Sequence, residues 1–176
     1  MKKNLALLAL SGLLLFSCKK EDVKTTEKVV TPNEIPANSN GYNVSTSANI
    51  DLIKKCVAAW VNGDFEEYEK YYATNAIIHD NKIGSTVSEN VAANKEFQKK
   101  NIKPTVEYNV IWEAVNYKAD EKGIKNFVLS HQTVTWKKDS KTIKVISFQI
   151  VAVKDGKIVE EWNIYDSVPF TEFIKK

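Results

Sequence analysis

The sequence of 176 residues contains no arginine, so all of its 25 basic residues are lysines. Planar, bidentate capture of a phosphate or a carboxylate is a speciality of the guanidinium group. Chemistry that depends on a guanidinium is therefore excluded. Without residues 1–17, which hold two of the lysines and no acidic residue, the chain carries 23 lysines against 22 acidic residues. This balance argues against nucleic acid as a partner.

The sequence is also poor in cysteine and histidine, with two of each. His79, His131 and the acidic residues do not show the close spacing that metal ligands usually have, so no metal and no cofactor is expected. Cys56 lies on the apolar side of a predicted helix, where it is interpreted as a buried core residue.

The apolar run Leu5–Phe16 is shorter than the roughly 20 residues that a transmembrane helix needs. Lys2 and Lys3 precede it, as in an export signal. A transmembrane anchor is the alternative interpretation, and the length of the run argues against it.

The end of this run, Leu15-Phe16-Ser17-Cys18, resembles the lipobox of bacterial lipoproteins. The resemblance implies cleavage before Cys18, a diacylglyceryl group on its thiol and acylation of the new amine. Two or three acyl chains hold a protein stably at a membrane. The resemblance therefore predicts a signal peptide over residues 1–17 and a lipid-anchored lipoprotein of the cell envelope. Such a protein would lie in the outer membrane, facing the periplasm or exposed on the cell surface. A lipidated Cys18 leaves Cys56 without a disulfide partner.

Residues 18–46 are rich in Lys, Glu, Thr, Asn and Pro and have no apolar period, which predicts a flexible tether. The remaining residues, 47–176, are numerous enough for one domain with its own core. Apolar spacing and capping residues predict helices over residues 47–62, 64–72 and 86–100, capped by Ser47, Asp64 and Thr86. A short strand over 76–79 separates the second helix from the third.

After Pro104 the pattern changes to four long runs rich in Val, Ile, Thr and aromatic residues, over 106–117, 124–136, 142–153 and 158–168. Short turn clusters between them require antiparallel neighbours, and Asp155-Gly156 is the strongest hairpin signal. The sequence thus predicts an α+β domain in which three N-terminal helices pack on the concave face of a curved antiparallel sheet.

Three segments resemble the nuclear transport factor 2-like superfamily, and in particular its SnoaL-like branch. They are Ala59–Phe65, at the junction of the first two helices, Asn75–Asp80, which ends in His-Asp, and the last hairpin, Asp155–Asp166. The resemblance implies a cone-shaped half-barrel with a pocket between sheet and helices. Epoxide hydrolases of this superfamily use an Asp-Arg-Asp arrangement, which a chain without arginine cannot supply.

Strand parity selects the side chains that face such a pocket. The even-numbered residues of the last strand share one face, which matches the inward face of the family: Ile158, Glu160, Trp162, Ile164 and Asp166. Asp166 corresponds to the acid/base carboxylate of SnoaL-like cyclases, and a carboxyl group in an apolar pocket has a raised pKa that suits proton transfer. His79 is the second catalytic candidate. The alternatives are a turn or cap acceptor for Asp166 and a structural histidine for His79.

Aromatic residues indicate what the pocket accepts. Five of them fall on elements expected to border it: Trp60, Tyr72, Trp112, Trp136 and Trp162. The candidate ligand-binding residues are Trp60, Tyr72, Trp112, His131 and Trp162. A cross-strand structural role is the alternative for His131.

The favoured function is a lipid-anchored envelope domain that binds a small apolar or amphipathic ligand, with no catalysis assumed. Members of the superfamily that this sequence resembles often dimerise through the outer face of the sheet. Val110, Ile146, Phe148 and Ile150 make both faces of their strands apolar, which suits such a homodimer. One alternative is a SnoaL-like cyclase, isomerase or dehydratase that uses an acid/base carboxylate. Another is a partner-recruiting subunit of an envelope assembly.

Overall fold

A computed structural model describes residues 40–81 and 83–175 of the protein. This part of the chain forms four helices, α1 (Ala48–Asn62), α2 (Phe65–Lys70), α3 (Val87–Lys99) and α4 (Ser167–Lys175). Its seven strands are β1 (Gly41–Val44), β2 (Tyr72–Asp80), β3 (Ile83–Thr86), β4 (Lys103–Asn116), β5 (Asn126–Lys138), β6 (Lys141–Lys154) and β7 (Lys157–Tyr165). The signal peptide, Cys18 and residues 18–39 of the predicted tether lie outside the described residues.

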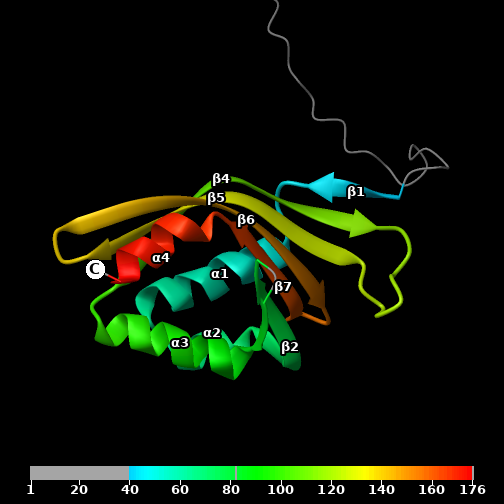
Figure 1. Cartoon of the computed structure of the whole chain (residues 1–176). Coiled ribbons are helices and arrows are strands. Elements are labelled where there is room, and N and C mark those ends of the chain that lie inside the picture. The colour runs from blue at the N-terminus through cyan, green and yellow to red at the C-terminus, as the bar shows by residue number, and fades with distance from the viewer. Residues whose placement is uncertain (1–39, 82, 176) are drawn as a thin grey trace, which may run out of the picture. The chain divides into compact units, whose positions relative to one another are not determined.

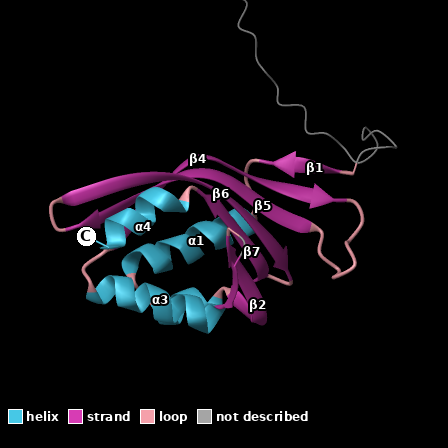
Figure 2. Cartoon of the chain, viewed as in Figure 1, coloured by secondary structure: helices cyan, strands magenta, loops and turns pink. Residues whose placement is uncertain are grey.

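The seven strands form one curved sheet in the order β1-β4-β5-β6-β7-β2-β3. All neighbours are antiparallel except β2 and β7, which run parallel. The sheet arches over the helices, which lie on its concave side (Figures 1 and 2). The predicted α+β fold, with a curved, mostly antiparallel sheet and helices on one face, is confirmed.

The caps predicted for the first three helices are present. Ser47 Oγ accepts a hydrogen bond from the backbone N–H of Ile50 at 3.1 Å. The carboxylate of Asp64 accepts one from the backbone N–H of Glu67 at the same distance. Thr86 and Glu89 form a full capping box at the start of α3. These bonds satisfy backbone donors that a helix end otherwise leaves without partners.

Several elements differ from the sequence prediction. Gly41–Val44, assigned to the tether, forms the edge strand β1 on β4. Tyr72, assigned to the second helix, begins β2, because α2 ends at Lys70. Residues 167 and 168, assigned to the last strand, begin α4, and the Asp166 carboxylate accepts a hydrogen bond from the backbone N–H of Val168 at 3.0 Å. The short strand β3 was also not predicted.

A bulge between β6 and β7 decides which side chains of β7 face the helices. Val153 pairs with Ile158, but the next residue back on β6, Ala152, pairs with Glu160. Val159 is therefore an extra residue, and the strand changes its alternation at this point. Beyond the bulge, the concave face carries Glu161, Asn163 and Tyr165. The predicted inward set after Ile158, namely Glu160, Trp162, Ile164 and Asp166, is wrong for this reason.

The apolar core lies between α1 and the concave face. Its most deeply buried side chains come from α1, β2, β5, β6 and β7 and include Ile50, Ile53, Ile78, Val128, Val151 and Ile158. This core occupies one end of the half-barrel, and the other end is left hollow.

Candidate functional site

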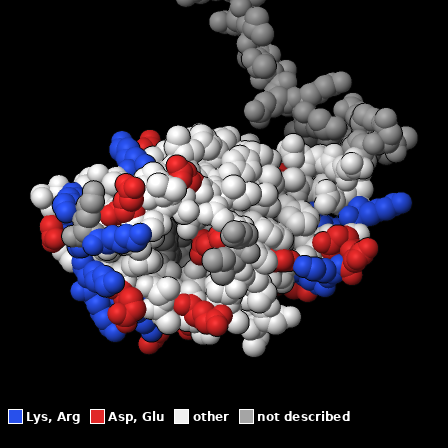
Figure 3. Space-filling view, viewed as in Figure 1, with Lys and Arg blue, Asp and Glu red and all other residues white. Residues whose placement is uncertain are grey.

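A cavity of about 270 Å³ lies between the concave face of the sheet and helices α1, α3 and α4. It opens on the face of the molecule that carries α3 and α4, where the space-filling view shows a hollow (Figure 3). The volume is close to the lower end of the range of about 300 to 1,000 Å³ that is typical of small-molecule pockets. The predicted pocket between sheet and helices is therefore present.

One part of the cavity wall is aromatic. Trp136 of β5 contacts three other rings that line the cavity, with centroids 5.6 Å from Trp60, 6.1 Å from Phe97 and 4.6 Å from Phe170. These rings come from α1, α3 and α4, so the wall joins three helices to the sheet. Such surfaces favour the apolar body of an organic molecule.

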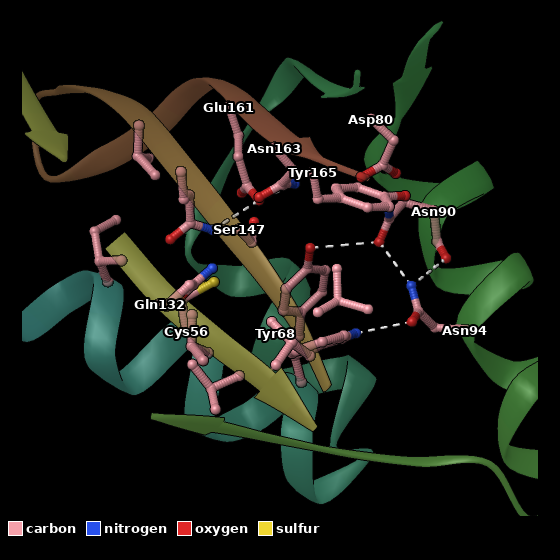
Figure 4. Close-up of a pocket in the computed structure, with 18 of the residues that line it drawn as sticks. Cys56, Tyr68, Asp80, Asn90, Asn94, Gln132, Ser147, Glu161, Asn163 and Tyr165 are labelled. Atoms are coloured by element: carbon pink, nitrogen blue, oxygen red, sulfur yellow. Dashed lines mark hydrogen bonds between the residues drawn. The ribbon is translucent and has the colours of Figure 1, made fainter. Parts of the chain in front are cut away.

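A chain of hydrogen bonds leads from this wall toward the polar part of the cavity (Figure 4). Trp60 Nε1–H donates to Asn94 Oδ1 at 2.8 Å, and Asn94 Nδ2 donates to Asn90 Oδ1 at 2.9 Å. The same oxygen of Asn90 accepts a longer hydrogen bond, 3.4 Å, from the Tyr68 hydroxyl. Asn90 and Asn94 are one helical turn apart on α3, which lets both face the cavity.

Glu161 of β7 is the centre of the polar end. Its carboxylate is buried, with 5% of the residue exposed, and accepts three hydrogen bonds. The donors are the Tyr72 hydroxyl at 2.5 Å, Gln149 Nε2 at 3.0 Å and Asn163 Nδ2 at 2.8 Å. The Tyr72 hydroxyl also lies 2.8 Å from that of Tyr68. These hydrogen bonds offset part of the free-energy cost of burying a carboxylate.

Asp80, at the end of β2, is the second carboxyl group that lines the cavity. Burial, and next the nearby Glu161, raise the pKa of Asp80 from its usual 3.8 to about 6, against a smaller lowering by the Asn163 amide. Burial and the Asp80 charge raise the pKa of Tyr165 to about 12. Two carboxyl groups in unequal surroundings are typical of functional sites.

Two of the residues predicted as ligand-binding, Trp60 and Tyr72, do line the cavity. The others do not. Direct cross-strand partners lie on the same face of a sheet. One row of such partners runs over the convex face through Trp112, Leu129, Ile150, Trp162 and His79. A second row contains Val110, His131, Phe148 and Ile164. Trp112, His131 and Trp162 are thus outer-face residues, and their placement in the pocket is corrected.

The two catalytic candidates also lie outside the cavity. The His79 ring stacks on Trp162 with 5.5 Å between the ring centroids, and its Nε2 lies 3.0 Å from Glu160 Oε1. Lys122 Nζ is 2.5 Å from the other oxygen of Glu160, so His79 belongs to a surface cluster with Glu160 and Lys122. Asp166 is exposed and caps the start of α4. The cap interpretation of Asp166 fits this position.

Sequence reasoning missed Asp80, Glu161 and Asn163 as cavity residues. Adjacent residues of a strand point to opposite faces, and of the pair His79 and Asp80 the sequence analysis assigned His79 to the pocket, whereas Asp80 lines the cavity. The sequence did offer one indication. Glu160 and Glu161 are adjacent on a strand, so one of the two side chains must face the helices whichever way the strand alternates. Nothing in the sequence marks the bulge that selects Glu161.

Cys56 of α1 lines the cavity and is 2% exposed, in agreement with its prediction as a buried residue. Burial, and secondarily the Glu161 charge, raise the pKa of its thiol far above its usual value, which keeps the thiol protonated. Within residues 40–81 and 83–175, no group of three or more His, Cys, Asp or Glu side chains is placed to hold a metal ion. None of the helices in these residues is long and apolar enough to cross a membrane.

No protein-family model and no curated protein matches the chain. Solved structures do match it. An LEH-like epoxide hydrolase from Mycobacterium tuberculosis superposes with a TM-score of 0.56 at 16% identity, over 75% of this chain and 93% of that chain. IdmH from Streptomyces antibioticus, a proposed polyketide cyclase, superposes with a TM-score of 0.54 at 16% identity, over 74% of this chain and 100% of that chain. A proposed SnoaL-like polyketide cyclase from Shewanella putrefaciens superposes with a TM-score of 0.56 at 10% identity, over 74% of this chain and 87% of that chain.

These likenesses establish the fold. The protein has a nuclear transport factor 2-like cone fold, which is similar to the folds of these three proteins. Identities of 10 to 16% carry no information about its own substrate or reaction. Function therefore has to be argued from the cavity itself.

Proposed function

We propose that this protein binds a small amphipathic organic molecule in the cavity between its sheet and its helices. The observation that carries the proposal is the combination of one aromatic wall with one hydrogen-bonded polar end in a single hollow of about 270 Å³. Such a division positions an apolar body and a polar head at the same time. Binding requires no chemical step, so no catalysis is assumed.

We further propose that the domain acts as a lipoprotein of the bacterial cell envelope. The support is the sequence alone, since Lys2, the apolar run Leu5–Phe16 and Cys18 form the leader and lipobox pattern. Lipid on Cys18 would anchor the protein, and the segment that follows would tether the domain to the membrane.

A pair of adjacent alanines on α3 provides the test of ligand binding. Ala93 lines the cavity and Ala92 does not, although both are exposed and accept a larger side chain without disturbing the core. Naphthylethanol, a neutral amphipathic probe, is expected to bind the protein in isothermal titration calorimetry. Ala93→Trp is expected to weaken this binding at least tenfold, because an indole there obstructs the cavity.

Ala92→Trp is the matched control and should bind like the wild type. Absence of binding to the wild type would contradict the proposal, and so would equal losses in the two variants.

Proton transfer is a second candidate function, and the pKa of Asp80 favours it. A carboxyl group with a pKa of about 6 exchanges protons near neutral pH, and this one lines an organic-binding cavity. If the protein is such an enzyme, it should accelerate exchange of the α-protons of a cyclic ketone, tetralone, in heavy water, as followed by NMR. Asp80→Asn should abolish the acceleration and Asp166→Asn should preserve it. A rate equal to that of buffer alone would eliminate this candidate.

We also propose that the convex face of the sheet forms a homodimer. Its two cross-strand rows present aromatic and aliphatic side chains, of which Val110 is 48% and Ile164 52% exposed; Ile146, on the same face, is 64% exposed. Contiguous exposed apolar surface of this kind is typical of protein interfaces. Three of the residues expected from the sequence to bind ligand would instead form part of the surface between two copies: Trp112, His131 and Trp162.

A further inference from the structure

The charged and polar groups of the cavity define the chemistry of the ligand more narrowly than its shape does. Asp80 and Glu161 are the acidic residues among the described residues that line it, and none of these lining residues is a lysine, arginine or histidine. A ligand in the cavity therefore meets negative charge without a compensating protein cation.

Glu161 and Asp80 are close enough for the charge of one to disfavour the charge of the other. The three donors on Glu161 are all uncharged groups, from Tyr72, Gln149 and Asn163. An anionic ligand would add a third negative charge to a partly desolvated space, which is strongly unfavourable. A cationic ligand would supply the opposite charge that both carboxyl groups lack.

Unpaired acceptors point to the same ligand chemistry. Gln149 is 6% exposed, and its Oε1 atom has no hydrogen-bond partner. Its orientation is fixed, because its Nε2 donates to the carboxylate of Glu161, which accepts only. Gln132, 4% exposed, also lines the cavity with an unpaired Oε1 atom. Buried oxygens without partners are rare, and a ligand N–H group would satisfy them.

We propose that the ligand is a small aromatic or aliphatic amine that binds in its protonated form, with the ammonium group between Asp80, Glu161 and the Gln149 oxygen. The apolar body then lies against the aromatic wall of Trp60, Trp136 and Phe170. This inference rests on the proposed function and specifies the ligand class of the same cavity. The arrangement selects against carboxylates and phosphates.

Three probes of one shape test the proposal by isothermal titration calorimetry near neutral pH. They are naphthylethylamine, which is cationic, naphthylethanol, which is neutral, and naphthylacetate, which is anionic. The amine is expected to bind at least tenfold more tightly than the alcohol, and the carboxylate is expected not to bind. The preference for the amine should decline as the pH falls below about 6, because Asp80 takes up a proton.

Two variants locate the effect. Asp80→Asn and Glu161→Gln are each expected to reduce the ratio of amine affinity to alcohol affinity at least fivefold. Asp80→Asn retains the shape of a side chain that is only partly buried, so it remains informative if Glu161→Gln fails to fold. Glu160→Gln, whose side chain lies on the convex face, is the matched control and should preserve the preference.

The possible outcomes separate this inference from the proposed function. If the alcohol binds and the amine binds no more tightly, the amine proposal is overturned while the ligand-binding function stands. If the preference for the amine is unchanged in both cavity variants, the assignment to these two carboxyl groups is overturned. If neither probe binds, the proposed function itself has failed.

Discussion

Replacement of Asp80 by asparagine is expected to stabilise the folded protein by up to about 3 kcal/mol at a pH above 7. In the folded state the pKa of Asp80 is about 6, whereas its usual value is 3.8, so ionisation is harder in the fold than in the unfolded chain. The wild type therefore loses stability as the pH rises through about 6. Asparagine carries no charge and keeps an oxygen for the Asn163 amide.

The gain in stability of the Asp80→Asn variant over the wild type should increase with pH. It is expected to be complete above about pH 6 and to vanish as the pH falls toward 4, where Asp80 is protonated in both the folded and the unfolded states. Urea denaturation of both proteins at several pH values measures this difference. Asp166→Asn is the control, because that exposed cap should give no such gain. A destabilised Asp80→Asn variant at neutral pH would contradict the account, since functional residues characteristically reduce stability.

Replacement of Ile164 by aspartate is expected to convert a homodimer into a monomer. Ile164 is 52% exposed and belongs to the cross-strand row that continues through Phe148 and His131 to Val110. In a dimer formed by this face, the new carboxylate would be buried without a partner, at a cost of several kcal/mol. The dimer dissociation constant should rise at least a hundredfold, as measured by light scattering during size-exclusion chromatography.

The matched control for the dimer is Val168→Asp. Val168 is 61% exposed but lies on α4, away from the convex face, so this variant should leave the molar mass unchanged. A wild-type protein that is monomeric at tens of micromolar would exclude the dimer. Equal increases of the dimer dissociation constant in Ile164→Asp and Val168→Asp would show that the interface is not on the convex face.

The fold could be predicted from the sequence because its determinants are local. Ser47, Asp64 and Thr86 are helix caps that act within three residues, and Asp155-Gly156 specifies its hairpin through positive φ angles of 52° and 70° at the two turn positions. Helix α4 was missed because residues 167 and 168 were assigned to the end of the last strand, although Pro169 is compatible with the first turn of a helix. The edge strand β1 was missed because its four residues have no apolar pattern and gain their order from β4.

The site could be predicted only in part, because its geometry depends on one extra residue. A regular hairpin places the even-numbered residues of β7 on the concave face, and the bulge at Val159 reverses this beyond Ile158. A regular hairpin and a bulged hairpin both bring apolar and acidic side chains and an aromatic ring to each face of β7. The residue pattern of the strand therefore does not distinguish the two hairpins. Trp60 does line the cavity from the predicted helix α1, and Tyr72 lines it from β2 rather than from the predicted second helix.

The four tryptophans of the chain provide the most direct test of the central claim, which is that the cavity behind the bulge binds the ligand. Trp60 and Trp136 line the cavity, whereas Trp112 and Trp162 lie on the convex face. In a titration with naphthylethanol, followed by the indole N–H resonances in a proton–nitrogen NMR spectrum, the account predicts saturable shifts for Trp60 and Trp136 and stationary signals for Trp112 and Trp162. Shifts of Trp112 and Trp162 with Trp60 and Trp136 unmoved would contradict it.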